Sequence, residues 1–212
     1  YLADLLQDIK KLKLKKPPLI MGHSFGSLLT QMIATKIKIK GFILLTPVPP
    51  GGICIWKPSV IRIFAEVIAK WAFWRKPFRF TYRTAVFGLM KLLPPEKRKR
   101  YYNNLLHESG RAGVETGFYF FDPNKTAFVD RTRIKGPGLI IAAKKDRMMP
   151  ASLARKTLKR YKDVIDIEYR EYPNHAHWIM DEPGWQKVAQ DIYDWIVKIL
   201  KKDKRKKQVP SG

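Results

Sequence analysis

A serine between two glycines, after a short apolar run and before an apolar helical pattern, has the sequence form of a nucleophile on a tight strand-to-helix turn. Such a turn strains the serine backbone and leaves no room for side chains two residues before and after it. Ser24 fits this description, because Gly22 and Gly26 flank it. The turn also places the backbone N–H of Phe25 where it could stabilise a developing oxyanion. A serine that only caps a helix would not require both glycines.

A nucleophilic serine needs a base and an acid that orients the base. Asp146 follows the apolar run of residues 138–143. Two histidines, His175 and His177, follow a further strand pattern at residues 167–172. Because the carboxyl ends of parallel strands meet at one edge of a sheet, these loops are expected to lie beside the serine. The spacing alone leaves either histidine open as the base.

Three separated motifs resemble those of the α/β-hydrolases of the esterase, lipase and peroxidase-like type. They are GHSFG at residues 22–26, AAKKDRMMP at residues 142–150 and YPNHAHWIMDEPGW at residues 172–185. The chain order of serine, acid and histidine is also that of this superfamily. The resemblance covers most of residues 17–200, although residues 27–141 match it only weakly.

The resemblance implies a role for each candidate residue. Ser24 would be the nucleophile, Asp146 the orienting acid and His177 the general base, because His177 rather than His175 falls directly before the aromatic residue of the family's histidine loop. His23 lies inside the elbow, at a position that is often a packing histidine in relatives. Asp181 and Glu182 are expected to be exposed acids in the first turn of the last helix.

The expected fold class is α/β: the C-terminal part of an α/β-hydrolase fold, with a mostly parallel sheet flanked by helices and an inserted helical cap. Apolar or β-rich runs predict strands at residues 19–21, 41–45, 138–143 and 167–172. The expected parts are a hydrolase core at residues 1–50 and 134–200, a helical cap rich in aromatic residues at 51–133, and a basic disordered tail at 201–212.

In this superfamily the strand before the nucleophile normally follows several other strands and a glycine-rich loop that donates a second oxyanion N–H. No such segment precedes Tyr1 in the sequence. We therefore expect an N-terminally truncated hydrolase that lacks the first strands. Its strand at residues 19–21 would then form an open sheet edge.

The composition gives 42 lysines and arginines against 18 aspartates and glutamates, a formal net charge of +24. Such a surface attracts polyanions, although a lysine-biased genome would produce the same charge without any function. No nucleic-acid-binding signature accompanies the basic runs, so no specific nucleic-acid recognition is expected. The expected partners are a small-molecule ester or acyl substrate and, through the basic runs, weak contact with an anionic membrane surface or nucleic acid.

The single Cys54 and the four histidines show no disulfide or metal-ligand pattern, so no metal and no cofactor are expected. No apolar stretch has the length of a membrane span, and no signal peptide is visible. A cytoplasmic location is expected, with association at a membrane surface left open.

The function indicated by these residues is that of a serine hydrolase, which cleaves a carboxylic ester or related acyl bond through a Ser-His-Asp triad and an acyl-enzyme. The same triad could pass the acyl group to an alcohol or peroxide, or cleave a carbon–carbon bond. The alternative is a non-catalytic hydrolase fragment or pseudoenzyme that binds a partner or a polyanion through its basic surface.

Overall fold

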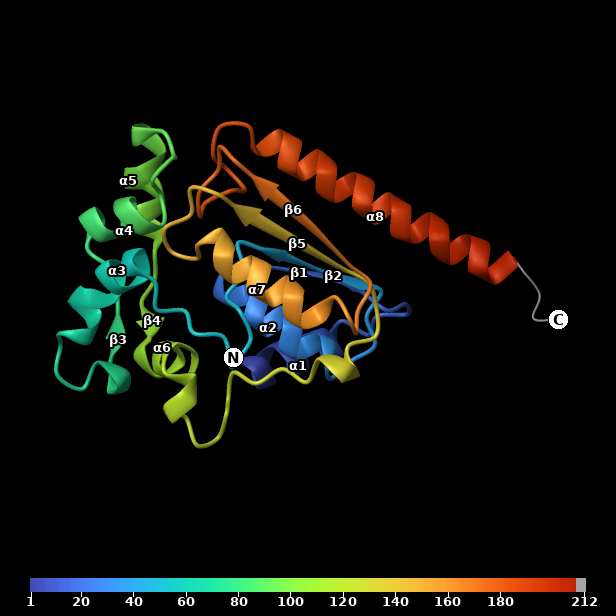
Figure 1. Ribbon diagram of the computed structural model, residues 1–212, viewed down its shortest axis with the longest axis horizontal. Helices are drawn as coiled ribbons and strands as arrows, with labels where there is room; N and C mark the ends of the chain where they lie inside the picture. Colours follow the sequence, from blue (N-terminus) through green and yellow to red (C-terminus); the bar gives the residue numbers. More distant parts are fainter. Residues whose placement is uncertain (209–212) are drawn as a thin grey trace.

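The computed structural model describes the backbone of residues 1–208 and the side chains of residues 1–202 (Figure 1). Its main sheet has the order β1-β2-β5-β6, and every neighbouring pair is parallel. The strands are β1 (Leu19–His23), β2 (Gly41–Leu45), β5 (Gly138–Ala143) and β6 (Ile167–Tyr172). The predicted parallel sheet is thus confirmed, and β1 extends two residues beyond the expected strand, to His23.

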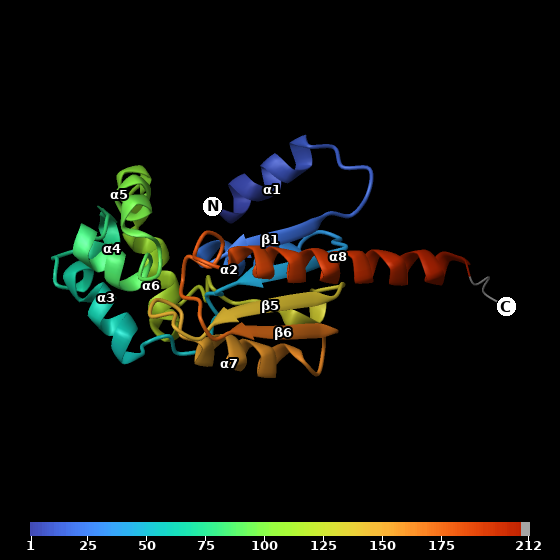
Figure 2. The same cartoon turned by 90° about the horizontal axis from the view of Figure 1, so that it is seen from above.

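Helices cover both faces of this sheet, which gives three layers. They are α2 (Phe25–Ala34), α7 (Ala151–Tyr161) and α8 (Trp185–Gln208), while α1 (Leu2–Lys11) packs against α2 beside the β1 edge (Figure 2). Helices α2 and α7 lie on one face, and α8 lies on the other (Figures 1 and 2). No helix within residues 1–208 is both long and apolar enough to cross a membrane.

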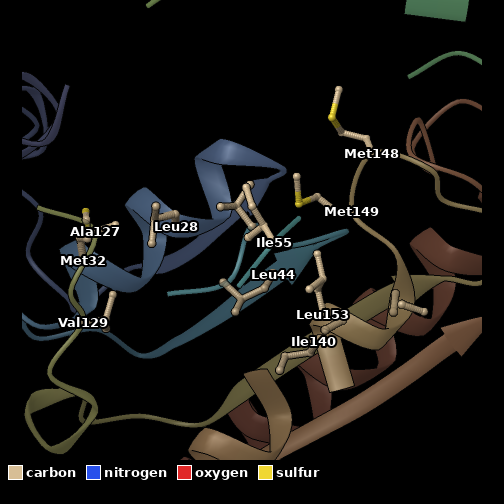
Figure 3. Packing of buried hydrophobic residues seen from close by; sticks show 14 of the residues in the cluster. Leu28, Met32, Leu44, Ile55, Ala127, Val129, Ile140, Met148, Met149 and Leu153 are labelled. Atoms are coloured by element: carbon tan, nitrogen blue, oxygen red, sulfur yellow. The ribbon is translucent and has the colours of Figure 1, made fainter. Parts of the chain in front are cut away.

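The central strands supply both cores, because successive side chains of a strand point to opposite faces. Phe42 and Leu44 of β2 join the cluster that includes side chains of α2 and α7 (Figure 3). Ile43 and Leu45 join the cluster that includes side chains of α8. Every residue of β2 and β5 is buried, as expected for strands covered on both faces.

The chain between β2 and β5 leaves the sheet. It forms α3 (Pro58–Ile68), η1 (Phe73–Arg75), β3 (Pro77–Phe78), α4 (Tyr82–Gly88), α5 (Pro95–Asn104), β4 (Glu108–Ser109), α6 (Gly110–Gly117), η2 (Tyr119–Phe121) and η3 (Arg131–Arg133). Helices α3 to α6 gather beyond the carboxyl ends of the sheet strands (Figure 1). The antiparallel pair of β3 and β4 was not expected from the sequence. The division into a core and a cap stays a prediction.

Strand β1 lies at one edge of the sheet. Within residues 1–208 it pairs with β2 alone, and its Met21 side chain is exposed. This arrangement agrees with the open edge expected beside the nucleophile strand.

The last helix differs from the expected disordered tail at residues 201–212. Helix α8 continues to Gln208, and residues 209–212 lie outside the described part of the chain. Two causes favour the longer helix. Lysine, arginine and glutamine have high helix propensities, and Lys202 forms an ion pair with Asp166 at 3.2 Å.

Candidate active site

The backbone of Ser24 turns sharply between the end of β1 and the start of α2. Its φ of 51° and ψ of −121° are strained for a residue other than glycine. The Ser24 N–H donates to the carbonyl oxygen of Leu45 at 3.0 Å. The Ser24 carbonyl oxygen accepts from the N–H of Ser27 at 3.0 Å and from the Ser27 hydroxyl at 2.5 Å. The expected elbow geometry is therefore present and held by neighbouring hydrogen bonds.

The two glycines of the elbow have unequal roles. A Cβ atom on Gly22 would lie 2.2 Å from the carbonyl oxygen of Gly26 and 2.4 Å from Oγ1 of Thr30. A Cβ atom on Gly26 would meet no other heavy atom within 4 Å, apart from nearby backbone of its own helix. The close approach of strand and helix thus requires glycine at position 22. The expectation that it also requires glycine at position 26 is wrong.

A chain of hydrogen bonds joins the three candidate side chains. Nε2 of His177 lies 2.9 Å from Oγ of Ser24, and Nδ1 of His177 lies 2.8 Å from Oδ2 of Asp146. A neutral imidazole protonated on Nδ1 fits both contacts, because it donates to the carboxylate and accepts from the hydroxyl. The side chains of His177 and Asp146 are almost fully excluded from solvent. This geometry can transfer a proton from the serine to the histidine.

The loops after β5 and β6 fix the histidine and the acid. Oδ1 of Asp146 accepts hydrogen bonds from the N–H groups of Met148 and Met149, both at 2.8 Å. These bonds leave Oδ2 for His177 and hold the carboxylate in one orientation. The two loops are also joined directly, since the N–H of Lys145 donates to the carbonyl oxygen of His175 at 2.9 Å.

His175, the other histidine considered as the base, is buried away from this chain of hydrogen bonds. Its ring packs against Tyr172, with the centroids 5.6 Å apart. Burial lowers the pKa of His175 below its ordinary value, and the positive charge of Lys145 acts in the same direction. The structure therefore brings His177, rather than His175, to Ser24.

His23 supports the histidine loop from inside the elbow. Its Nε2 lies 2.8 Å from the carbonyl oxygen of His177 and can donate to it, and the two rings are 4.8 Å apart between centroids. Burial, and then the nearby positive charge that His177 carries when protonated, lowers the pKa of His23 to about 3. His23 is therefore neutral near pH 7 and acts as a hydrogen-bond donor. The hydrogen bond from His23 to the histidine loop is a more specific role than the packing role expected from the sequence.

The two acids that follow the histidine, Asp181 and Glu182, lie in surroundings that differ from those predicted from the sequence. Both precede α8, and Glu182 is buried, with its Oε2 accepting from the N–H of Ala176 at 2.6 Å. Burial raises the pKa of Glu182. Asp181 accepts from Lys97 and from the Tyr101 hydroxyl, each at 2.8 Å. The expectation of exposed first-turn acids is wrong, because the acids stabilise the loop and link it to α5. For Glu182, the one sequence signal that sets it apart from a surface acid is its place in the Glu-Pro pair of the third motif.

Ser24 lies in the wall of an apolar pocket with a volume of about 170 Å³. Aromatic and aliphatic side chains from the segment between β2 and β5 form most of the wall, together with Met148 and Met149 from the loop after β5. Arg79 and Glu108 are the charged residues of the lining. Among the side chains of residues 1–202, no group of histidine, cysteine and acidic residues could hold a metal ion. Because the lining is mostly apolar but includes two charged residues, the pocket suits a ligand in which an apolar group is joined to a polar one.

The sequence profile of the alpha/beta hydrolase family matches residues 1–190, so the chain belongs to this family. A comparison with curated protein sequences finds no significant match.

Solved structures with the same fold have low sequence identity to this chain. A monoacylglycerol lipase from Paleococcus ferrophilus is 23% identical, with 93% of this chain and 74% of that chain covered and a TM-score of 0.64. A lipase-esterase related protein from Clostridium acetobutylicum is 12% identical, with 91% and 74% covered and a TM-score of 0.59. A meta-cleavage product hydrolase from Pseudomonas fluorescens is 13% identical, with 96% and 71% covered and a TM-score of 0.60. At these identities the likeness establishes the fold alone.

The unequal glycines give a paired test of the elbow. Gly22→Ala should lower the free energy of unfolding by about 3 kcal/mol or more, because its methyl group would overlap backbone atoms. Gly26→Ala should leave stability unchanged or raise it by up to about 1 kcal/mol, since alanine favours the helix. Urea unfolding followed by circular dichroism measures both. Equal losses in the two variants would contradict the assignment.

The neutral His23 predicts a pH dependence of stability. Between its folded pKa of about 3 and its ordinary value of 6.5, the unfolded chain binds a proton that the folded protein does not bind. The free energy of unfolding should therefore decrease as the pH falls, by roughly 2 kcal/mol from this group between pH 6.5 and 5. His23→Gln keeps a donor without titrating, so it should show a correspondingly smaller decrease. Identical pH profiles for wild type and variant would refute this role.

Proposed function

We propose that the protein is a serine hydrolase that cleaves carboxylic esters through an acyl-enzyme. The observation that carries the proposal is the continuous chain of hydrogen bonds from Ser24 through His177 to Asp146 at the wall of an apolar pocket. Membership of the alpha/beta hydrolase family supports hydrolysis as the reaction class. Ester specificity and the three catalytic roles are proposals.

In the proposed reaction His177 removes the Ser24 hydroxyl proton as the oxygen attacks the ester carbonyl carbon. The imidazolium that forms is stabilised by Asp146, whose carboxylate is already oriented by two backbone N–H groups. His177 then protonates the leaving alcohol, and Ser24 retains the acyl group. Water then attacks the acyl carbonyl while His177 takes its proton, and the acid is released as His177 returns that proton to the Ser24 oxygen.

The proposed oxyanion donor is the backbone N–H of Phe25. Phe25 is the first residue of α2, where an N–H has no partner within the helix. The positive end of the helix dipole also favours negative charge at this point. Gly22 supports the same site indirectly, because it lets β1 approach α2 closely.

The pocket favours esters with an apolar acyl or alcohol group. Phe64, Phe78 and Phe80 of the segment between β2 and β5 line it together with Ser24. We assign residues 51–133 to a cap that supplies this wall. Arg79 and Glu108 would face the polar part of a substrate, because they are the charged residues of the lining.

A fluorophosphonate probe tests the nucleophile. Wild-type protein should be labelled and Ser24→Ala should not, while Ser152→Ala on α7 serves as a matched control that labels normally. Asp146→Asn should slow labelling by roughly 10³- to 10⁴-fold, because the imidazole would lose its productive tautomer. Folded wild-type protein that remains unlabelled, or a labelled Ser24→Ala variant, would favour the non-catalytic alternative.

The apolar pocket predicts a dependence on acyl-chain length. The kcat/KM for p-nitrophenyl hexanoate should exceed that for the acetate by about tenfold or more, since each buried methylene contributes about 0.8 kcal/mol. Initial rates measured below the critical micelle concentration give the comparison. Equal values for the two esters would show that the pocket does not bind the acyl group.

A further inference from the structure

The twelve residues 69–80, with the sequence AKWAFWRKPFRF, combine five aromatic side chains with four cations and no acid. They connect α3 to α4 and carry η1 and β3. This loop projects at the end of the molecule opposite the carboxyl end of α8 (Figure 1). Its Lys70, Trp71, Trp74, Arg75 and Lys76 side chains are exposed, and we call these five residues the aromatic–basic tip.

The tip presents two tryptophan rings to solvent. The Trp71 side chain is 86% exposed and that of Trp74 is 41% exposed, yet their rings contact each other with centroids 6.2 Å apart. The intervening Ala72 has a φ of 55°, a left-handed conformation that costs energy for a residue other than glycine. The loop therefore presents two large aromatic surfaces to solvent.

The tip is anchored to the pocket wall rather than free. The Phe73 ring contacts Trp74 on one side, at 5.4 Å between centroids, and Phe118 on the other, at 6.5 Å. The segment then continues through β3 into Phe78, which lines the pocket beside Ser24. A surface that binds the tip would thus lie next to the pocket.

The charges of the tip are available for a partner. Lys70, Arg75 and Lys76 form no ion pair with any residue whose side chain the structure describes. Exposed cations beside tryptophan rings match the surface of an anionic bilayer. Phosphates there attract cations, and the interface accommodates the amphipathic indole ring. A nucleic acid would also attract the cations, but the sequence contains no nucleic-acid-binding signature beside its basic runs.

We propose that the aromatic–basic tip docks the protein on the surface of a bilayer that contains anionic lipid. Trp71 and Trp74 enter the interface, and Lys70, Arg75 and Lys76 contact the lipid phosphates. Docking in this position brings the pocket close to the lipid. The binding itself does not depend on the proposed hydrolase activity, so it is tested separately.

The test uses the full chain and sedimentation with vesicles of phosphatidylcholine containing one quarter phosphatidylserine, at about 150 mM salt. Wild-type protein should bind these vesicles and should bind pure phosphatidylcholine vesicles at least about tenfold more weakly. The Trp71→Ala/Trp74→Ala variant and the Lys70→Gln/Arg75→Gln/Lys76→Gln variant should each lose about tenfold or more in affinity. Ser24→Ala should bind as wild type does.

Another basic segment provides a matched control. Leu12 and Leu14 are 66% and 49% exposed and lie among exposed lysines after α1. The Leu12→Ala/Leu14→Ala and Lys13→Gln/Lys15→Gln/Lys16→Gln variants remove the same numbers of apolar side chains and charges as the tip variants. They should bind vesicles within about twofold of wild type, because the proposal assigns binding to the tip.

Three results would overturn the proposal. The first is no binding of wild-type protein to the anionic vesicles. The second is equal losses in the tip and control variants, which would show a general effect of charge. The third is unchanged vesicle binding in Trp71→Ala/Trp74→Ala together with salt-sensitive binding of single-stranded RNA that the same variant loses, which would identify the tip as a nucleic-acid contact.

Discussion

The strained backbone of Ser24 is the constraint on which the site depends. A residue other than glycine held at such a φ and ψ costs about 1–3 kcal/mol, so the surrounding structure must stabilise it. Leu45 at the end of β2 accepts from the Ser24 N–H, and the N–H groups of Ser27 and Val48 both donate to the Ser24 carbonyl oxygen. Sheet, helix and the loop after β2 therefore hold the nucleophile together. The close approach at Gly22 is the steric condition for this arrangement.

Burial keeps one histidine beside the serine neutral. His23 is kept neutral and can donate to the His177 carbonyl, which Thr46 also approaches at 3.4 Å. The Asp146 carboxylate faces the other side of the His177 ring and is satisfied by backbone donors. The histidine is thus fixed by its backbone and by its Nδ1 atom. Its Nε2 atom can therefore accept a hydrogen bond from the Ser24 hydroxyl.

Much of this arrangement follows from the sequence, because its signals are local. Buried parallel strands appear as apolar runs, and their order places Asp146 and His177 beside Ser24. The errors concern features that depend on tertiary contacts. The space beside Gly26 depends on how α2 packs, and the burial of Glu182 depends on how its loop folds back to Ala176. The pairing of β3 with β4 joins segments about 30 residues apart, and neither is long enough to show a strand pattern.

The contacts of Asp181 link α5 to the loop that carries His177. Lys97 and Tyr101 belong to α5, whereas Asp181 is four residues after His177. The Tyr101 ring also lies 5.1 Å from that of Trp178, the residue next to His177. Any movement of α5 away from the sheet must break these contacts or displace the histidine loop with it. The position of α5 and the alignment of the imidazole are consequently mechanically coupled through the loop that carries His177.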